Sequence, residues 1–312
     1  TGTVWPFVVT CLVLYWAGVF GRFWFWTFTY ARAYGSIIPF AEAVIRLRQS
    51  VATIFSFDGP LWCIAGIGLV ILFLDRRTRS HRVFLVGLLT FSFLGVSAGL
   101  YYRPHYFVLL LPAAAILCGI AVVSGTESLR HRFSNAAIAA VPAIIFAAAL
   151  AFSVVEEHLI FFAETPVIAG RRIYYKDPFA EAEKVAEYIK MNSSATARIA
   201  VFGSEPEIYF YSQRKSATGY IYTYGLLEEQ KHAEQMRQEM LSEVINARPE
   251  YIVFVDDELS WGWRGTENEF FRRILLYINS EYVKAGEVEI LGNPEHGMGD
   301  SSKIYLFQRK TE

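Results

Sequence analysis

The sequence has few cysteines and almost no net charge for its length. Its 312 residues include three cysteines, and basic and acidic side chains nearly balance, which leaves a formal net charge of -1. Cys11, Cys63 and Cys118 all lie in apolar segments, so we predict small packing residues there and no disulfide or metal framework. A chain without surplus positive charge offers no large basic surface, which excludes nucleic acid as a partner.

Several common catalytic and binding motifs are also missing. The sequence has no Walker motif, no zinc-ligand spacing and no pattern typical of a Ser-His-Asp triad. Gly203 in VFGSEP lacks the further glycines that bring a pyrophosphate close to a helix N-terminus. Nucleotide binding is therefore not supported. No cofactor is indicated, and a divalent metal is compatible with the acidic residues without being indicated by their spacing.

The first half of the chain consists mainly of long apolar runs. A helix that crosses the hydrocarbon core of a bilayer needs roughly 20 largely apolar residues, with about 17 as a lower limit. The runs contain no lysine or arginine, and Asp58 is their one acidic residue. The sequence thus predicts a multi-pass α-helical membrane domain over residues 1–155, with five transmembrane helices. The five segments are 4–20, 55–74, 83–100, 106–123 and 136–155.

The connections between these segments predict an orientation. Residues 75–82 carry four arginines and residues 124–134 carry two, and short loops rich in positive charge stay in the cytoplasm. Residues 21–57, the turn after residue 100 and the C-terminal half are then predicted to lie outside. Because residues 21–57 interleave aromatic side chains with arginine, we expect helices that lie flat in the interface, broken near Gly35 and Pro39. Such helices either anchor the protein or line an opening for a lipid tail.

From residue 156 to residue 312 the pattern is that of a soluble α/β domain. Apolar strands, among them RIAVFG and YIVFVD, alternate with helical segments. This order predicts a mainly parallel sheet in a three-layer arrangement, with an antiparallel edge from the last strands, 282–291 and 303–309. Three helices are predicted, starting at Asp177 and Pro178, at Leu226, and at a capping box of Thr266 and Glu269.

Two acidic segments follow the predicted strands. They are GSEPE, with Glu205, and DDELS, with Asp256 and Asp257. Since α/β domains bind ligands at the carboxyl ends of their strands, these carboxylates are candidates for holding a cation or a sugar. Acidic residues also commonly cap and solvate the ends of loops. Both interpretations stay open.

A basic and aromatic segment, SQRKSATGYIYTYG, lies between the predicted strands. Arg214 and Lys215 precede Tyr220, and basic groups beside aromatic rings suit contact with carbohydrate or phosphate. The same residues suit docking of the outer domain on its own membrane part. We therefore predict a ligand or docking role for these three residues.

The pentad RPHYF leads directly into an apolar run and combines Arg103, His105 and Tyr106. A guanidinium group can bind phosphate oxygens in a bidentate manner, so these residues are candidates for binding a phosphate headgroup at the outer face. In the competing interpretation Arg103 extends to the membrane surface and Tyr106 belongs to an aromatic belt.

Three segments resemble a known family. RPHYFVLLLPAAAIL, FWFWTFTYARAY and VFGSEPEIYFYSQRKSATGYIYTY are similar to segments of bacterial membrane glycosyltransferases of the GT-C fold, in the branch related to the protein O-mannosyltransferases. The resemblance covers essentially the whole chain, which would correspond to the C-terminal part of such an enzyme. Its opening on Thr1, directly before an apolar run, also favours a fragment.

The resemblance implies an inverting enzyme of the bacterial plasma membrane. It would transfer a sugar from a polyprenyl-phosphate donor to a protein, lipid or glycan acceptor at the outer face, where the C-terminal domain would also lie. In that family the catalytic carboxylate belongs to an acidic pair in the first external loop. The chain has no such pair followed by several membrane helices, so we expect the catalytic base to lie outside it.

Two other classes of protein compete with this interpretation. One is a membrane-anchored ligand-binding or sensor protein whose outer α/β domain recognises the ligand. The other is a transporter, which we consider the weakest candidate because ion-coupled transporters carry ionisable groups inside the membrane, and these segments have only Asp58, near an end.

Overall fold

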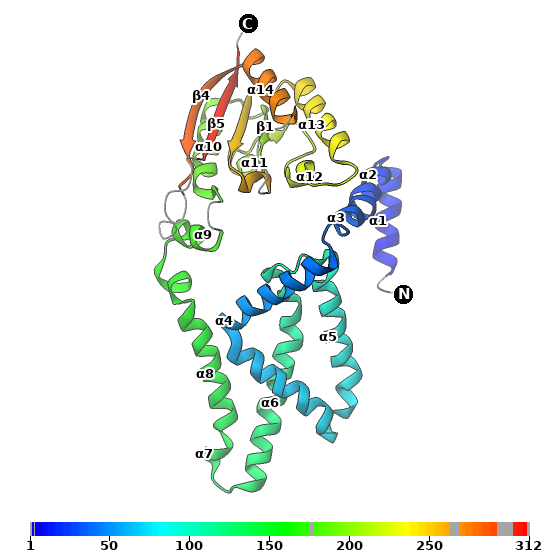
Figure 1. Cartoon of the computed structure of the whole chain (residues 1–312), viewed down its shortest axis with the longest axis vertical. Helices are drawn as coiled ribbons and strands as arrows, with labels where there is room; N and C mark the ends of the chain where they lie inside the picture. The colour runs from blue at the N-terminus through cyan, green and yellow to red at the C-terminus, as the bar shows by residue number, and fades with distance from the viewer. Residues whose placement is uncertain (1, 3, 175–176, 263–268, 292–301, 311–312) are drawn as a thin grey trace. The chain divides into compact units, whose positions relative to one another are not determined.

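The computed structural model divides the chain into two compact units, Thr1–Ala163 and Glu164–Glu312. It describes all residues except 1, 3, 175–176, 263–268, 292–301 and 311–312. Unit 1 is helical, whereas unit 2 contains a mixed sheet with helices (Figure 1). The sequence placed the division at 155/156, and the two units meet at 163/164.

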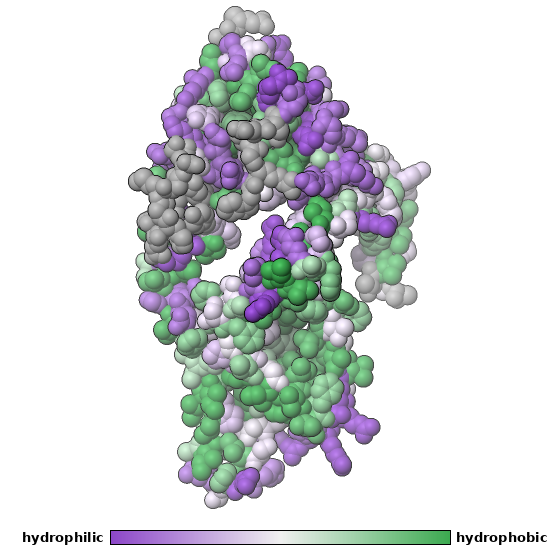
Figure 2. Space-filling model, viewed as in Figure 1, coloured by the Kyte–Doolittle hydropathy of each residue, from purple (hydrophilic) through white to green (hydrophobic). Residues whose placement is uncertain are grey.

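Unit 1 contains two helical stretches long and apolar enough to cross a membrane, Phe40–Leu74 and Pro104–Arg132. The α-helices Val4–Trp16 and Val141–Glu156 are apolar but shorter. Hydrophobic residues dominate the visible surface of this unit (Figure 2). Two membrane-spanning helices are therefore supported, and the other three of the five predicted spans stay a prediction. The α-helices are α1 (Val4–Trp16), α2 (Phe20–Trp24), α3 (Ala31–Tyr34), α4 (Phe40–Leu74), α5 (Arg82–Val96), α6 (Leu111–Arg132), α7 (Ala136–Ala139) and α8 (Val141–Glu156).

Short 3-10 and π-helical segments join these helices. One of them, Arg76–His81, falls within 75–82, where the sequence predicted a loop, whereas Ala98–Leu100 lies at the end of the predicted span 83–100. The segments are η1 (Phe25–Tyr30), η2 (Arg76–His81), η3 (Ala98–Leu100), η4 (Pro104–Leu110) and η5 (Leu159–Ala163).

Helix α4 runs through the boundary that the sequence placed between an interfacial segment and a membrane segment. Its 35 residues would extend about 52 Å if straight, well beyond a hydrocarbon core of about 30 Å. Pro60 lies inside it, and the ribbon changes direction between the two parts of α4 (Figure 1). Proline has no N–H to donate and its ring crowds the preceding turn, which bends a helix. The charged first part and the apolar second part thus point in different directions.

Helix α6 continues beyond its predicted end. The apolar run stops at residue 123, but the helix extends to Arg132, so the predicted loop 124–134 is wrong over most of its length. Three basic residues, Arg130, His131 and Arg132, occupy its last turn, where positive charge complements the partial negative charge of a helix C-terminus.

The core of unit 1 forms where α4 crosses α6. Gly68 of α4 lies directly against the backbone of Leu117, because a Cβ atom at position 68 would fall 2.6 Å from the carbonyl carbon of Leu117. Small residues allow membrane helices to approach this closely and gain van der Waals contact. Leu72, Cys118 and Ala149 are buried in the same apolar cluster.

Unit 2 is built on a five-stranded sheet in the order β2-β1-β3-β5-β4. Strands β1 and β2 and strands β1 and β3 are parallel, whereas β5 is antiparallel to both of its neighbours, β3 and β4. The predicted antiparallel edge is thereby confirmed. The strands are β1 (Arg198–Phe202), β2 (Lys215–Ser216), β3 (Tyr251–Asp256), β4 (Tyr282–Glu289) and β5 (Lys303–Arg309).

Side chains alternate along each strand, so the strands present apolar residues on both faces of the sheet. Helices cover both faces. On one face, Ile199, Val201 and Val253 pack with Ala182 and Ile189 of α10 in a buried apolar cluster. On the other face, Phe254 contacts Phe271 of α14, with ring centroids 6.2 Å apart. The helices of unit 2 are α9 (Pro166–Tyr174), α10 (Phe179–Asn192), α11 (Glu207–Ser212), α12 (Tyr224–Leu227), α13 (Ala233–Ala247), η6 (Leu259–Trp261) and α14 (Glu269–Glu281).

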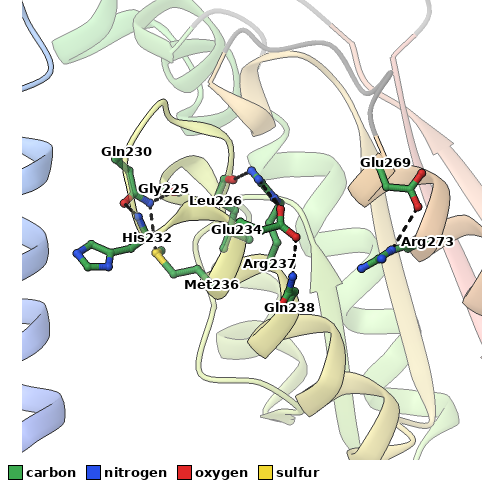
Figure 3. Close-up of polar contacts among 10 residues, drawn as sticks. All are labelled: Gly225, Leu226, Gln230, His232, Glu234, Met236, Arg237, Gln238, Glu269 and Arg273. Atoms are coloured by element: carbon green, nitrogen blue, oxygen red, sulfur yellow. Dashed lines mark hydrogen bonds and ion pairs between the residues drawn. The ribbon is translucent and has the colours of Figure 1, made fainter.

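One predicted helix start differs by one residue, and one predicted helix is divided in two. Helix α10 is preceded by Pro178 at the N-cap position rather than by Asp177. The helix predicted from Leu226 is divided into α12 and α13, because the side chain of Gln230 bonds to the carbonyl of Gly225 at 3.0 Å and that of Arg237 to the carbonyl of Leu226 at 2.7 Å (Figure 3). The predicted partner of Glu269 in a capping box, Thr266, lies outside the described residues.

Candidate functional site

The pentad RPHYF follows a turn whose backbone is strained. Gly99 has φ +77°, and the two non-glycine residues Leu100 and Tyr102 have φ +60° and +47°. Residues other than glycine keep such backbone angles only where the surrounding structure holds them, and this kind of strain concentrates at functional sites. Here Ser50 of α4 donates a hydrogen bond to the carbonyl of Tyr102, and both groups are buried. The turn is thus fixed by α4.

Two guanidinium groups converge on the ring of Tyr101 in this turn. The Cζ atom of Arg46 lies 5.7 Å from the ring centroid and that of Arg103 lies 5.6 Å from it. Tyr34 stacks on the same ring, with centroids 4.8 Å apart and an angle of 12° between the planes. The aromatic helices and RPHYF, predicted separately, therefore meet in the structure. We call Arg46, Arg103 and Tyr101 the arginine pair site.

The charge of this site is only partly neutralised. Arg46 forms an ion pair with Glu42 one turn earlier in α4, at 2.6 Å. Arg103 is exposed and pairs with no carboxylate among the described residues. Guanidinium groups with free N–H donors suit the oxygens of a phosphate.

The other two predicted residues of the pentad differ in their surroundings. The exposed His105 ring contacts Tyr106 edge-on, with centroids 4.8 Å apart. Tyr106 is half-buried and packs against the apolar cluster around Phe107. His105 is therefore open to a ligand, whereas Tyr106 mainly supports the turn.

A second site forms in unit 2 at the carboxyl ends of β1 and β3. Ser260 Oγ donates to Glu205 Oε2 at 2.9 Å and accepts from the backbone N–H of Ser204 at 2.9 Å. Thr223 joins them through the hydroxyl of Ser204, at 3.0 Å. Gly203 allows this packing, because a Cβ there would lie 2.9 Å from Ser260 Oγ and 2.7 Å from a methyl group of Val255. We call this the strand-end site.

The strand-end site gathers carboxylates. Glu205 is 3% exposed, and its pKa is raised to about 8: burial is the largest cause, the hydrogen bond from Ser260 lowers the pKa, and the nearby carboxylates Glu207, Asp257 and Asp177 raise it. Burial is also the main cause of a raised pKa at Asp177 and Glu207. At neutral pH Glu205 is thus protonated and able to donate a hydrogen bond.

Sequence reasoning found only part of this cluster. Two of the predicted residues, Glu205 and Asp257, lie close enough for the negative charge of Asp257 to raise the pKa of Glu205. Asp256 points elsewhere, into a small cavity of about 300 Å³ that Lys284 and Tyr305 also line. Successive residues at a strand end face opposite sides of the sheet.

The residues missed by sequence reasoning are Arg46, Ser50 and Tyr101 in unit 1 and Asp177 and Thr223 in unit 2, whereas Glu207 belongs to the predicted acidic segment GSEPE. The sequence predicts Asp177 as a helix cap, and its position beside a predicted parallel sheet is the signal that points to the strand ends. The pairing of Arg46 with a turn more than fifty residues later carried no local signal.

Arg214 and Tyr220 serve the fold of unit 2. The guanidinium of Arg214 donates to the carbonyls of Lys190, Ser193 and Ser212 at 2.9–3.0 Å. These bonds cap the C-terminal ends of α10 and α11. Tyr220 is buried and donates to a carboxylate oxygen of Glu239 at 2.8 Å. Among the three predicted residues of that segment, Lys215 is the exposed one.

Replacing Arg214 by alanine is expected to lower the free energy of unfolding of unit 2 by about 2 kcal/mol, because buried carbonyls lose charged donors. Hydrogen exchange of peptides from α10 and α11 would measure the loss. The adjacent Lys215→Ala is the control and should leave exchange unchanged. Equal protection in both variants would show that Arg214 has no capping role.

No group of three or more His, Cys, Asp or Glu in the described part of the chain is arranged to hold a metal ion. No known protein family, curated protein or solved structure matches the chain.

Proposed function

We propose that this chain is the C-terminal part of a bacterial membrane glycosyltransferase. The enzyme would transfer a sugar from a polyprenyl-phosphate carrier to an acceptor at the outer face of the plasma membrane, with its catalytic carboxylate outside this chain. The observation that supports the proposal is the arginine pair site, where Arg46 and Arg103 lie within 6 Å of the ring of Tyr101.

The chemistry of the transfer needs such a site. When the sugar leaves its carrier, negative charge develops on the lipid phosphate, and fixed cations stabilise that charge most strongly where water is scarce. A carboxylate base elsewhere in the enzyme would take the proton of the acceptor hydroxyl. In this proposal Arg103 contacts the phosphate, Arg46 adds a second positive charge and His105 flanks them.

The bend of α4 also fits this role. Its first part carries Arg46 and Ser50, and its second part is apolar. A lipid carrier needs a polar headgroup site next to an apolar surface, and a helix that changes character at a bend offers both. The aromatic segment around Tyr34 lies against the same turn through its stack on Tyr101.

The test is donor binding and sugar transfer in the full-length protein in lipid nanodiscs. Arg103→Ala is expected to weaken binding of a polyprenyl phosphate about tenfold or more, because a charge-assisted bond to phosphate is lost. Arg46→Ala is expected to weaken binding less, because it removes only the second positive charge. Arg48→Ala removes an exposed arginine two residues from Arg46 and should change nothing. Unchanged affinity in Arg103→Ala would contradict the proposed donor site. The absence of transfer from any polyprenyl-phosphate sugar would contradict the proposed enzymatic activity.

A second candidate is a membrane-anchored ligand-binding protein, and the strand-end site favours it. Open α/β sheets bind ligands at the carboxyl ends of their strands, where Glu205 and Asp257 lie. A soluble ligand whose affinity depends on Glu205, in a protein that transfers no sugar, would favour this alternative.

A further inference from the structure

Helix α9 follows closely on the apolar helices of unit 1. Residues 157–165 join it to the end of α8 at Glu156, and Leu159–Ala163 are themselves helical. With about 3.5 Å for each extended residue and about 1.5 Å for each helical one, α9 begins within about 20 Å of the end of α8. Helix α8 is apolar and packs beside α6 through Ala149 and Cys118. A segment tethered this closely to α8 stays within reach of the surface of any bilayer that α6 crosses.

The segment between α8 and α9 exposes large apolar side chains. The apolar run of α8 ends at the charged Glu156 and Glu157, yet Phe161 and Phe162 in η5 come soon after it and are 63% and 77% exposed. Exposed apolar side chains that cluster in one place mark contact with a partner or with a membrane. The chain therefore keeps an apolar character between α8 and α9.

The two sides of α9 are exposed in the reverse of the order typical of a soluble domain. Residues three and four apart share a side of a helix, so Ile168 lies beside Arg171 and Arg172. The opposite side carries Pro166, Ala169, Gly170 and Ile173. The side chains of Arg171 and Arg172 are only 18% and 32% exposed, whereas Ile173 is 54% exposed. A Cβ atom at Gly170 would have no neighbour within 4 Å, so the apolar side is open there.

Ion pairs within unit 2 fix α9 in this orientation. Arg171 donates to Glu181 of α10 at 2.5 Å, and Glu181 is buried. The Nε atom of Arg172 donates to Glu164 at 2.7 Å. Removing one partner from a pair with a buried carboxylate leaves an uncompensated charge, which resists rotation of the helix. The arginine side is thus held toward the protein and the apolar side faces outward.

The apolar side of α9 continues onto the start of α10. The rings of Tyr174 and Phe179 meet edge-on with centroids 5.3 Å apart, and both residues are exposed. Val167 is exposed as well, at the other end of α9. We call Val167, Ile173, Tyr174 and Phe179 the α9 face.

We propose that the α9 face inserts into the interface of the lipid bilayer and anchors unit 2 there. The occupant is lipid because the face follows α8 and the exposed rings of η5 along one short stretch of chain, and because tyrosine favours the headgroup level. Since Arg171 and Arg172 already pair with carboxylates, apolar burial holds the helix and lipid charge contributes little. The proposal needs a membrane around unit 1 and does not depend on sugar transfer.

The test uses the whole chain in phosphatidylcholine nanodiscs, with a dansyl-bearing amino acid in place of the exposed Ile173. Lipid that carries a nitroxide on its acyl chain is expected to remove roughly half or more of the dansyl emission, because an interfacial helix is buried about 5–10 Å into the bilayer. Exchanging part of the phosphatidylcholine for phosphatidylglycerol should leave this loss unchanged.

Two other positions carry the same probe as controls. Leu276 is an exposed apolar residue of α14, and Ile168 is an exposed residue on the arginine side of α9. The probe at 276 should keep its emission, and the probe at 168 should lose less than the probe at 173. Equal losses at 173 and 276 would overturn the proposal, and equal losses at 168 and 173 would overturn the orientation. Emission at 173 that is shifted to the blue but insensitive to nitroxide would also overturn it, because protein rather than lipid would then cover the α9 face.

Discussion

Gly68→Ala is expected to separate α4 from α6 and to lower the free energy of unfolding of unit 1 by about 3 kcal/mol or more. The added methyl group would overlap the carbonyl group of Leu117, which is backbone and has no rotamer to change. Overpacking at such a site forces whole helices to shift. Thermal denaturation of the purified chain in detergent would report a lower midpoint.

Gly66→Ala provides a matched control two residues away in the same helix. A Cβ at position 66 would have no neighbour within 4 Å, so the same change in helix propensity occurs without a clash. Alanine favours a helix over glycine by about 1 kcal/mol, and this variant should be neutral or slightly more stable. Equal midpoints for the two variants would mean that α4 and α6 do not cross at Gly68.

Glu205→Gln is expected to stabilise unit 2 at pH 8 and to remove most of its dependence on pH between 5 and 8. The side chain is buried among carboxylates, and its pKa of about 8 lies far above the ordinary value of 4.5. Glutamine keeps an oxygen to accept from Ser260 and carries no charge, so it mimics the protonated acid at every pH.

The sign of this pH dependence follows from the number of protons bound in the folded and unfolded states. Between pH 4.5 and 8 the unfolded chain has lost the proton of Glu205 while the folded chain retains it, so the free energy of unfolding falls as pH rises. At about 1.4 kcal/mol for each pH unit the loss is on the order of 5 kcal/mol, and it ends above pH 8, where both states are ionised.

Hydrogen exchange of peptides from β1 and β3, corrected for the intrinsic rate at each pH, would measure this slope. Glu183→Gln, at an exposed position of α10, is the control and should keep the slope of the wild type. A wild-type stability that stays constant from pH 5 to 8 would show that Glu205 is ionised in the fold.

Hydrophobic pattern predicted the location of most elements but not their limits. The apolar run of α6 ends near residue 123, yet backbone hydrogen bonding needs no apolar side chain and continues to Arg132. In α4 the arginines predict a separate surface helix, whereas one continuous helix carries a charged part and an apolar part, contains Pro60 and changes direction along its length (Figure 1). The strands were easier to find, because buried parallel strands are short and continuously apolar.

The sites were predictable only where one short segment contained the chemistry. Arg103 and Glu205 each stood out within their segments. Their partners Arg46 and Asp177 come from α4 and from the segment just before α10, and the sequence carries no signal for the crossing of α4 with the turn or for how closely this segment approaches the strand ends. Such contacts depend on how elements pack, which periodicity does not report.

The position of β5 sets an order for the biosynthesis of unit 2. It follows β3 and β4 in the chain, yet it lies between them and pairs with both. While the ribosome is still translating residues before Lys303, one edge of β3 has no partner and β4 cannot join the sheet. Nascent chains that expose such an edge are prone to pair with one another. Premature termination before Lys303 would thus remove an internal strand, so shortened translation products are expected to aggregate rather than to lose a dispensable tail.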